Sequence, residues 1–327
     1  MILLTGATGF LGQYLLEELL TQGHDLRVLV RNPDNRDLPW KNLVEIAEGD
    51  VRDVLAVQQA VKGVSHVIHN AAVVSYWKGR RAEMMAVNVE GTANVVDMCL
   101  EEGVGKLVHM SSIAAMGDAD PDGGPVTEAS KYTNRPGLSW YSKSKHGAEL
   151  EVHRGVQEGL DAVMLNPGVI LGKGDWNRGT PKMFRMINAG LNYYNQRVTG
   201  FVGAADVARA TEIMLHRATQ SGERFLMVSE NLDQQKLFTM VAESLGKQPP
   251  SKQFPAALTP VVGLLSEWIS RMKGEEPILT RESLRNINGK VYYQADKIRE
   301  QGFKFTPIKK VIAQTAEAFK KEIMESA

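Results

Sequence analysis

The stretch Thr5-Gly6-Ala7-Thr8-Gly9-Phe10-Leu11-Gly12 decides the fold of this chain. An apolar run, residues 2–4, precedes it and predicts a strand, and apolar residues at intervals of three and four predict a helix after it. A glycine turn between a strand and a helix exposes backbone N–H groups beside the positive end of the helix dipole, which suits a pyrophosphate. We expect Gly6 to form the turn, Gly9 to admit the phosphate and Gly12 to let helix and strand touch.

Composition limits the function classes. The chain has 327 residues, enough for one large or two medium domains, and its 38 basic residues balance its 38 acidic ones. A neutral balance gives no reason to expect a nucleic-acid partner. The single cysteine, Cys99, excludes an internal disulfide and indicates a reducing compartment.

Nothing in the sequence indicates a membrane partner or an export signal. No apolar run approaches the roughly 20 residues that a spanning helix needs. Met1 leads directly into the first expected strand, which leaves no signal peptide. We therefore expect a soluble, cytoplasmic protein.

Strands and helices alternate along the first half of the chain. The pattern predicts strands at residues 2–4, 26–30, 43–47, 64–69, 106–110 and 162–166, with helices between them, including 54–61 and 82–102. Such alternation predicts an α/β fold, a Rossmann-type doubly wound parallel sheet with helices on both faces. Ligands of such sheets bind at the carboxyl ends of the strands.

The alternation fails after residue 172, and we expect a smaller C-terminal substrate lobe from there. The expected division is a dinucleotide-binding core at 1–170, to which 198–228 returns, and a lobe formed by 171–197 and 229–327. The further elements expected after residue 172 are helices at 181–189, 206–216, 237–245, 259–272 and 308–323 and a strand at 223–228, of which 206–216 and 223–228 fall in the returning segment.

Three segments invite a more specific expectation. The loop 117–139 is too long for an idle connection and is expected to form part of a cover. The helix 82–102 is apolar on more than one side, which predicts either deep burial or a dimer surface. The helix 259–272 is amphipathic, and we expect it to pack inward rather than lie on a membrane, since its polar side lacks a dense Lys/Arg cluster.

Tyr141-x-x-x-Lys145 places a phenol and an ammonium group one helical turn apart. A nearby cation favours the phenolate, and a phenol tuned in this way can exchange a proton with a carbonyl oxygen. A second copy of the motif, Tyr293-x-x-x-Lys297, lies in the expected lobe. Because only Tyr141 follows the nucleotide-binding alternation, we assign Tyr141 to the site and Tyr293 to packing.

The glycine pattern TGxxGxxG resembles that of the extended short-chain dehydrogenase/reductases. The segment from His109 to Gly117 resembles their SS-x-x-x-x-G segment, and the active-site hydroxyl aligns best with Ser112, with Ser111 as the runner-up. Further matching segments are Asp50-Val51, His69-Asn70-Ala71-Ala72, Asn88-x-x-Gly91-Thr92, Thr127-Glu128, Asn166-Pro167-Gly168-Val169 and Phe201-Val202-x-x-x-Asp206-Val207. The chain is most similar to dihydroflavonol reductase-like and 3β-hydroxysteroid dehydrogenase-like members. It departs from the pattern at Met116-Gly117, where the family often has Tyr-Gly.

This resemblance implies an NADP(H)-dependent oxidoreductase that interconverts a carbonyl and a secondary alcohol on a small organic substrate. Tyr141 would be the acid/base, Lys145 would lower its pKa and bind the nicotinamide ribose, and Ser112 would position the substrate oxygen. The superfamily commonly dimerises through the helix 82–102 and the tyrosine helix, so we expect a homodimer.

The end of the second strand indicates the cofactor. NAD sites place an acidic residue there, whereas a 2′-phosphate needs arginine. This strand ends Val30-Arg31-Asn32, which favours NADP(H), although Asp34 keeps NAD(H) open. The expected cofactor-binding residues are Gly6, Thr8, Gly9, Phe10, Leu11, Gly12, Arg31, Asn32, Asp50, Val51, Ala71, Ala72, Val73, Tyr141, Lys145, Pro167 and Val169. The expected substrate-binding residues are Tyr76, Trp77, Met116, Trp140 and Trp176.

Two other functions stay open. A nucleotide-sugar epimerase would share this fold, whereas a dehydratase of the family would carry Asp-Glu where this chain has Ile113 and Ala114. A dinucleotide-sensing protein without catalysis would typically lack the tyrosine–lysine pair. Residues 168–174 do not complete a phosphate loop, and the sequence has no Gly-x-Ser-x-Gly elbow of a hydrolase. His66 and His69 point to opposite faces of a strand and cannot share a metal ion, so we expect no metal site.

Overall fold

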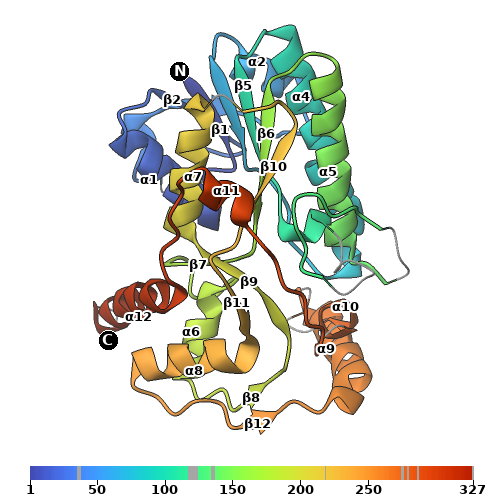
Figure 1. Ribbon diagram of the computed structural model, residues 1–327, viewed down its shortest axis with the longest axis vertical. Helices are drawn as coiled ribbons and strands as arrows, with labels where there is room; N and C mark the ends of the chain where they lie inside the picture. The colour runs from blue at the N-terminus through green and yellow to red at the C-terminus, as the bar shows by residue number, and fades with distance from the viewer. Residues whose placement is uncertain are drawn as a thin grey trace.

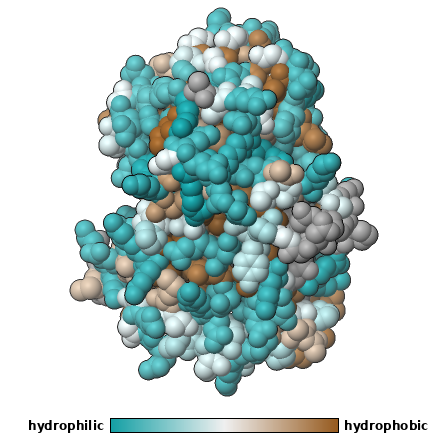
Figure 2. Space-filling model, in the orientation of Figure 1, coloured by the Kyte–Doolittle hydropathy of each residue, from teal (hydrophilic) through white to brown (hydrophobic). Residues whose placement is uncertain are grey.

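The computed structural model describes residues 1–34, 38–116, 124–133, 137–217, 219–273, 276–277, 280–285 and 287–325. Gly117 and much of the expected cover loop lie outside these residues. The molecule has an upper layered body and a lower lobe, and the chain ends beside the lobe (Figure 1). Hydrophobic side chains show in the hollow between the two parts (Figure 2).

A seven-stranded parallel sheet forms the upper body, in the order β10-β6-β5-β4-β1-β2-β3. Its strands are β1 (Ile2–Thr5), β2 (Leu26–Val30), β3 (Glu45–Glu48), β4 (His66–His69), β5 (Lys106–Met110), β6 (Ala162–Pro167) and β10 (Glu223–Met227). The first three strands build outward in one direction and the next ones in the other. This reversal leaves a crevice between the carboxyl ends of β1 and β4. The predicted doubly wound fold is confirmed.

Helices cover both faces of this sheet (Figure 1). On one face α1 (Phe10–Thr21) packs against α7 (Ala204–His216), and Leu15, Leu19 and Val207 enter their shared core. On the other face lie α2 (Val54–Val61), α4 (Gly91–Glu101) and α5 (Trp140–Gln157), which bury Val57, Val95 and similar residues. Apolar residues at helical spacing therefore face the sheet, as the sequence pattern predicts.

The lower lobe has its own sheet and core. β7 (Val169–Leu171), β9 (Val198–Gly203) and β11 (Glu230–Asp233) form a sheet in the order β11-β9-β7. α6 (Pro181–Asn188), α8 (Gln234–Leu245) and α12 (Ile308–Glu325) enclose an apolar cluster with it that includes Phe184 and Phe319. The short strands β8 (Tyr193–Tyr194) and β12 (Lys252–Gln253) pair below.

The chain crosses between the two parts more than once. β9, which the sequence analysis assigned to the returning segment, pairs within the smaller sheet, whereas α7 and β10 lie with the large one. In the other direction, α11 (Asp296–Glu300) sends Ile298 into the core of the upper body. The exact division of the chain into domains stays a prediction.

The helix expected at 82–102 is interrupted. It consists of α3 (Arg81–Met85), a π-helical turn at Ala86–Glu90, and α4. Met84, Val95 and Val96 are fully buried, so deep burial accounts for these apolar residues. An apolar pattern at spacing three and four does not reveal the extra residue of a π turn.

The expectation for the helix 259–272 was wrong. The helix forms as α9 (Thr259–Lys273), and its Glu267 pairs with Arg281 of α10 (Arg281–Arg285). Leu264, Trp268 and Met272 are instead 53 %, 61 % and 70 % exposed. Hydrophobic side chains accordingly reach the surface at the lower right of Figure 2, where α9 lies. Periodicity shows that one face is apolar but not what covers it.

Candidate active site

The glycine turn after β1 is as tight as the sequence indicates. Gly6 has a φ of +73°, and a Cβ there would lie 2.7 Å from the Ala71 backbone nitrogen. A Cβ on Gly12 would lie 2.1 Å from the Gly6 carbonyl oxygen. Only glycine at these two positions lets α1 begin directly beside the ends of β1 and β4. The turn thus leaves room and free backbone N–H groups for a phosphate.

A buried polar network, which the sequence analysis did not find, holds this turn. The Thr5 hydroxyl oxygen accepts from the backbone N–H groups of Asn70 and Ala71, both at 3.1 Å, and lies 2.8 Å from Nδ1 of His69. Because the oxygen accepts twice, its own hydrogen points to Nδ1, and His69 carries its proton on Nε2, 3.0 Å from the Thr92 hydroxyl. Burial lowers the pKa of His69 to about 3, so the ring is neutral.

A cleft of about 360 Å³ runs from this turn across the carboxyl ends of the strands. Most of the predicted cofactor-binding residues line it: Gly6, Thr8, Gly9, Phe10, Leu11, Arg31, Asp50, Val51, Ala71, Ala72, Val73, Tyr141 and Lys145. Other residues of the lining were not predicted: Thr5, Leu29, Val30, Gly49, Asn70, Val74, Val87, Met110, Ser111 and Ile170. A long crevice with a phosphate turn at one end fits a dinucleotide.

Four predicted cofactor residues do not line the cleft. Gly12 packs α1 onto the turn, and Asn32 is exposed beyond the end of β2. Pro167 is buried in β6, and Val169 pairs with Phe201 in the smaller sheet. These positions shape the fold around the cleft rather than its wall.

Charged groups gather at the β2 end of the cleft. Arg52 holds Asp50 through two hydrogen bonds of 2.9 Å from its guanidinium, and this contact lowers the pKa of the Asp50 carboxyl. Arg31 lies only 3.9 Å from the same carboxylate, and its side chain is 56 % exposed. Asp34, the residue that kept NAD(H) open, instead lies 3.4 Å from the Lys41 ammonium. Arg31 is therefore the group available to an anion at this end.

The tyrosine, the lysine and Ser112 meet at the other end of the cleft. Ser139 caps α5 by accepting from the Ser142 N–H at 2.9 Å, which fixes Tyr141 in the first turn. The Ser112 side chain lies close enough to the Tyr141 phenol to lower its pKa. The ring of Tyr76 approaches the Tyr141 ring edge-on, with centroids 6.0 Å apart.

The pKa of Tyr141 differs from the expectation that Lys145 would lower it. Burial raises the pKa of the phenol to about 12, and the nearby Ser112 side chain opposes this only in part. The Lys145 ammonium donates to the Met110 carbonyl oxygen at 2.6 Å, so it is directed at the end of β5. Burial also lowers the pKa of Lys145 to about 8, against the opposing influence of Glu149. The phenol therefore keeps its proton at neutral pH.

The two neighbouring serines have different partners. Ser111 donates to Glu149 at 2.6 Å, and Asn166 donates to the same carboxylate oxygen at 2.6 Å. Glu149 is buried and lies 3.5 Å from Arg224. Ser112, which lies beside Tyr141, is thus the hydroxyl near the expected acid/base. Glu149 and Arg224 were missed, although Glu149 follows Lys145 by one turn on α5.

The expected substrate residues divide into two groups. Tyr76 contacts Tyr141, and Trp140 begins α5 beside it with the Arg81 guanidinium 3.5 Å above its ring. The ring of Trp77 instead packs on the backbone two residues further on, where a Cβ added at Gly79 would lie 2.7 Å from it.

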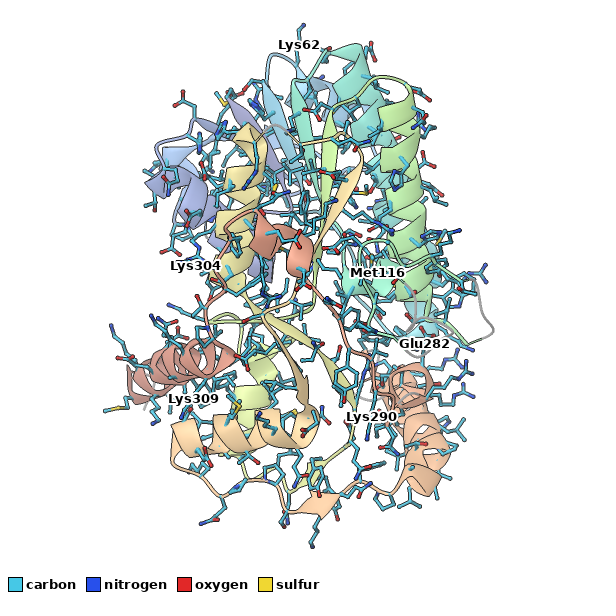
Figure 3. The ribbon with its side chains drawn as sticks, viewed as in Figure 1. Lys62, Met116, Glu282, Lys290, Lys304 and Lys309 are labelled. Carbon is cyan, nitrogen blue, oxygen red and sulfur yellow. The ribbon has the colours of Figure 1, made fainter. Side chains whose placement is uncertain are left out.

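Met116 and Trp176, which the sequence also placed in the substrate wall, have other surroundings. Met116 is fully buried with Val126 and Tyr293 near the lower end of α5 (Figure 3). Trp176 packs on Phe184 and Phe319 in the lobe core and donates to Glu322 at 2.6 Å. The sequence places both near an active-site motif but gives no direction for either side chain.

The second motif is structural. Tyr293 is buried in the same cluster as Met116, and its backbone N–H donates to Asn231 at 2.9 Å. Lys297 pairs with Glu223 at 2.9 Å. Neither lines the cleft, which agrees with the assignment of Tyr293 to packing.

Comparison with known proteins identifies the class. Residues 2–227 match the NAD dependent epimerase/dehydratase family, and the chain belongs to it. It is similar to a Synechocystis protein that carries the name of a dihydroflavonol 4-reductase (28 % identical, covering 96 % of this chain and 93 % of that one). It is also similar to sterol demethylase protein B of Methylococcus capsulatus (30 % identical, 88 % of each). The crystal structure of gox2253 is 32 % identical, covers 98 % of both chains and superposes with a TM-score of 0.82.

The chain is therefore an enzyme of the extended short-chain dehydrogenase/reductase superfamily that uses a nicotinamide dinucleotide and acts on CH–OH or carbonyl groups. Small molecules are the substrates of such enzymes. Within the part of the chain that the structure describes, no helix is long and apolar enough to cross a membrane.

Proposed function

We propose that this protein is an NADP(H)-dependent oxidoreductase that interconverts a carbonyl and a secondary alcohol on a small organic substrate. The observation that carries the proposal is that Tyr141 and Lys145 both line the cleft, with the Ser112 side chain close enough to Tyr141 to lower the pKa of its phenol. The nicotinamide supplies or accepts the hydride. The two hydroxyl groups provide a donor and a proton for the oxygen of the substrate, which is what carbonyl reduction needs.

The protonation of this site favours the reductive direction at neutral pH. With a pKa of about 12, the Tyr141 phenol carries the proton that a nascent alkoxide must receive. Ser112 shares the substrate oxygen with it, and Lys145 holds the end of β5 and is expected to meet the nicotinamide ribose. In the oxidative direction the phenol must first lose its proton, so that direction gains from high pH.

Dehydration has no support in the residues after Ser112. Ile113 is buried and apolar, and Ala114 offers only its backbone, whose N–H donates to the Ser112 hydroxyl at 3.1 Å. No carboxyl group at these positions can move a proton on the carbon next to the carbonyl. An epimerase needs no such group and is the outcome to distinguish by experiment.

A turnover screen tests the proposed reaction. Purified protein with NADPH should reduce at least one aldehyde or ketone of a broad panel, and Tyr141→Phe should lose this activity while Tyr293→Phe keeps it. Tightly retained oxidised cofactor with turnover of a UDP-sugar, and none of a free carbonyl, would identify an epimerase instead. Loss of activity in Tyr293→Phe alone would place the site elsewhere.

The preference for NADP(H) rests on Arg31. An exposed guanidinium beside the cleft can hold a 2′-phosphate through two parallel hydrogen bonds, and the loose contact with Asp50 leaves it free to turn. Calorimetry should find NADPH bound more tightly than NADH. Arg31→Ala should remove this difference by weakening NADPH alone, whereas Lys41→Ala, which disturbs only Asp34, should preserve it. Equal binding of both cofactors by the unaltered protein contradicts the preference.

We further propose a homodimer formed through α4 and α5, in a reducing compartment such as the cytoplasm. Leu150 on α5 is 54 % exposed, and the nearby Arg154–Asp97 ion pair of 2.6 Å ties the two helices into one surface. Light scattering should give twice the mass of the chain, and Leu150→Arg should give the monomer.

A further inference from the structure

Three side chains that can bind a metal ion meet near the amino ends of the strands of the large sheet, opposite the cleft. His24 lies in the turn between α1 and β2, and Glu212 and His216 lie one helical turn apart at the end of α7. Nε2 of His24 is 3.4 Å and Nε2 of His216 is 3.9 Å from the same Glu212 oxygen, and the three ligand atoms lie within 4.8 Å of one another. The amino ends of the strands of the large sheet are at the top of Figure 1, and Lys62, labelled at the top of Figure 3, lies at this end of the sheet.

These distances are close to those of a metal site. Zinc binds imidazole nitrogen and carboxylate oxygen at about 2.0–2.2 Å, so two ligand atoms of a tetrahedral site lie about 3.3 Å apart. The separations of 3.4 and 3.9 Å exceed this by little, and the side chains of His24 and Glu212 are each 21 % exposed, so that solvent reaches them. Two histidines and one carboxylate also form a set that zinc accepts while keeping a fourth position open.

The neighbouring His66 extends the cluster. It begins β4, and its ring centroid is 5.7 Å from that of His216. Its Nδ1 is 2.9 Å from the Ser65 hydroxyl, which orients the ring and leaves Nε2 for other contacts. A hydrogen bond at the other ring nitrogen is usual for a ligating histidine.

The geometry points to a binding site for a zinc-like divalent cation at His24, Glu212 and His216, with His66 placed to approach it. The cation would join the turn after α1 to the end of α7, the two helices that cover one face of the sheet. Its role would be structural, because the cluster and the nucleotide cleft lie at opposite ends of the strands. This site differs from the expectation of no metal, and the sequence gives no signal for it, because 188 residues separate His24 from Glu212 and no local motif joins them.

Competing ligands are few in the described part of the chain. No other group of three such side chains comes together there. Cys99 is buried, and burial raises the pKa of its thiol to about 12, so it does not offer a thiolate. A single strong binding event is therefore the expected result.

Titration of the full chain, purified without an affinity tag and freed of metal by a chelator, tests the site. Calorimetry with zinc chloride should give one bound ion per chain, and the melting temperature should rise with the zinc concentration. His24→Ala, His216→Ala and Glu212→Gln should each weaken zinc binding by at least about tenfold, as loss of a metal contact does. Each variant should keep the unaltered circular dichroism spectrum.

His153→Ala is the matched control, since it removes a partly buried histidine from α5, away from the cluster. It should bind zinc as the unaltered protein does. Cobalt(II) in place of zinc should give visible ligand-field absorption that His24→Ala and His216→Ala both lose. The site is refuted if the unaltered protein binds no zinc, or if His24→Ala and His216→Ala bind it with unchanged affinity.

Discussion

Single hydrogen bonds separate the roles of residues that look alike in the sequence. Ser111 and Ser112 are adjacent hydroxyls after the same strand, yet one donates to buried Glu149 and the other meets Tyr141. The sequence favoured Ser112 by alignment but gave no physical reason. The structure supplies one: the partners of the two serines lie two turns apart along α5, Tyr141 beside Ser112 and Glu149 beside Ser111.

Ser112→Ala should lower kcat by about 10²–10³ with little change in NADPH affinity, because the lost donor meets only the substrate oxygen. Ser111→Ala should mainly lower stability, by about 1–3 kcal/mol, since the Glu149 carboxylate loses a donor in a buried site. Steady-state kinetics and urea unfolding of both variants measure the two effects. The reverse order of effects would show that Ser111 is the active hydroxyl.

The pH dependence of stability reports the burial of Lys145. Its pKa is about 8 in the folded protein against an ordinary value of 10.5, so the unfolded chain binds more protons between these values and stability rises with pH across this window. The stabilisation is complete above pH 10.5 and is lost as pH falls through 8. Its upper limit is on the order of 3 kcal/mol, at 1.36 kcal/mol per pKa unit.

Lys145→Met should remove this rise. Urea unfolding at about pH 7.5 and about pH 10 should give a larger gain for the unaltered protein than for the variant. Tyr141 acts in the opposite sense and only at higher pH, because its raised pKa favours the folded state until the phenol ionises towards pH 12. Identical slopes for protein and variant would mean that Lys145 is solvated in solution.

At the scale of elements, the π-helical turn between α3 and α4 holds a loop that lines the cleft. Asn88 sits in this turn, is buried, and makes two hydrogen bonds with the backbone of Val73, at 2.7 and 2.9 Å. It also donates to Ser144 of α5 at 2.9 Å. The sequence identified the segment as part of the family pattern, but the interruption of the helix has no signal in the spacing of apolar residues. An extra residue in the turn is what directs Asn88 at the strand loop.

Asn88→Ala should therefore weaken both stability and cofactor binding. Leaving the Val73 N–H and carbonyl unsatisfied should cost about 2–4 kcal/mol in unfolding free energy. NADPH affinity should fall as well, because Val73 lines the cleft. Glu90→Ala, an exposed side chain of the same turn, should leave denaturation and calorimetric titration unchanged. Full NADPH affinity in Asn88→Ala would show that the loop holds its position without this side chain.

For the whole molecule, the nucleotide-binding body and the helices of the lobe were predictable, whereas the short strands of the lobe and its contacts with the body were not. The glycine turn, the strand and helix alternation and the Tyr141 motif are local patterns, each within a few turns of chain. The lobe depends on short strands such as β7 and β11, which pair through β9 across long stretches of sequence. Contacts between lobe and body, such as the Arg80–Glu276 pair at 3.1 Å and the Trp140 N–H to Glu282 at 2.9 Å, likewise have no local signal.

Buried and exposed apolar residues of the lobe should contribute differently to its free energy of unfolding. Phe184 is fully buried where α6, α8 and α12 meet, with the Trp176 ring 6.2 Å away, whereas Trp268 on α9 is 61 % exposed. Phe184→Ala should cost about 3–5 kcal/mol, because it removes buried area and leaves a cavity. Trp268→Ala should change the free energy of unfolding by no more than about 0.5 kcal/mol, as for other surface sites. Urea denaturation of both variants, at one low protein concentration, measures the difference. A large loss for Trp268→Ala would mean that the outer face of α9 is covered in solution and that the folded chain differs there from the structure described.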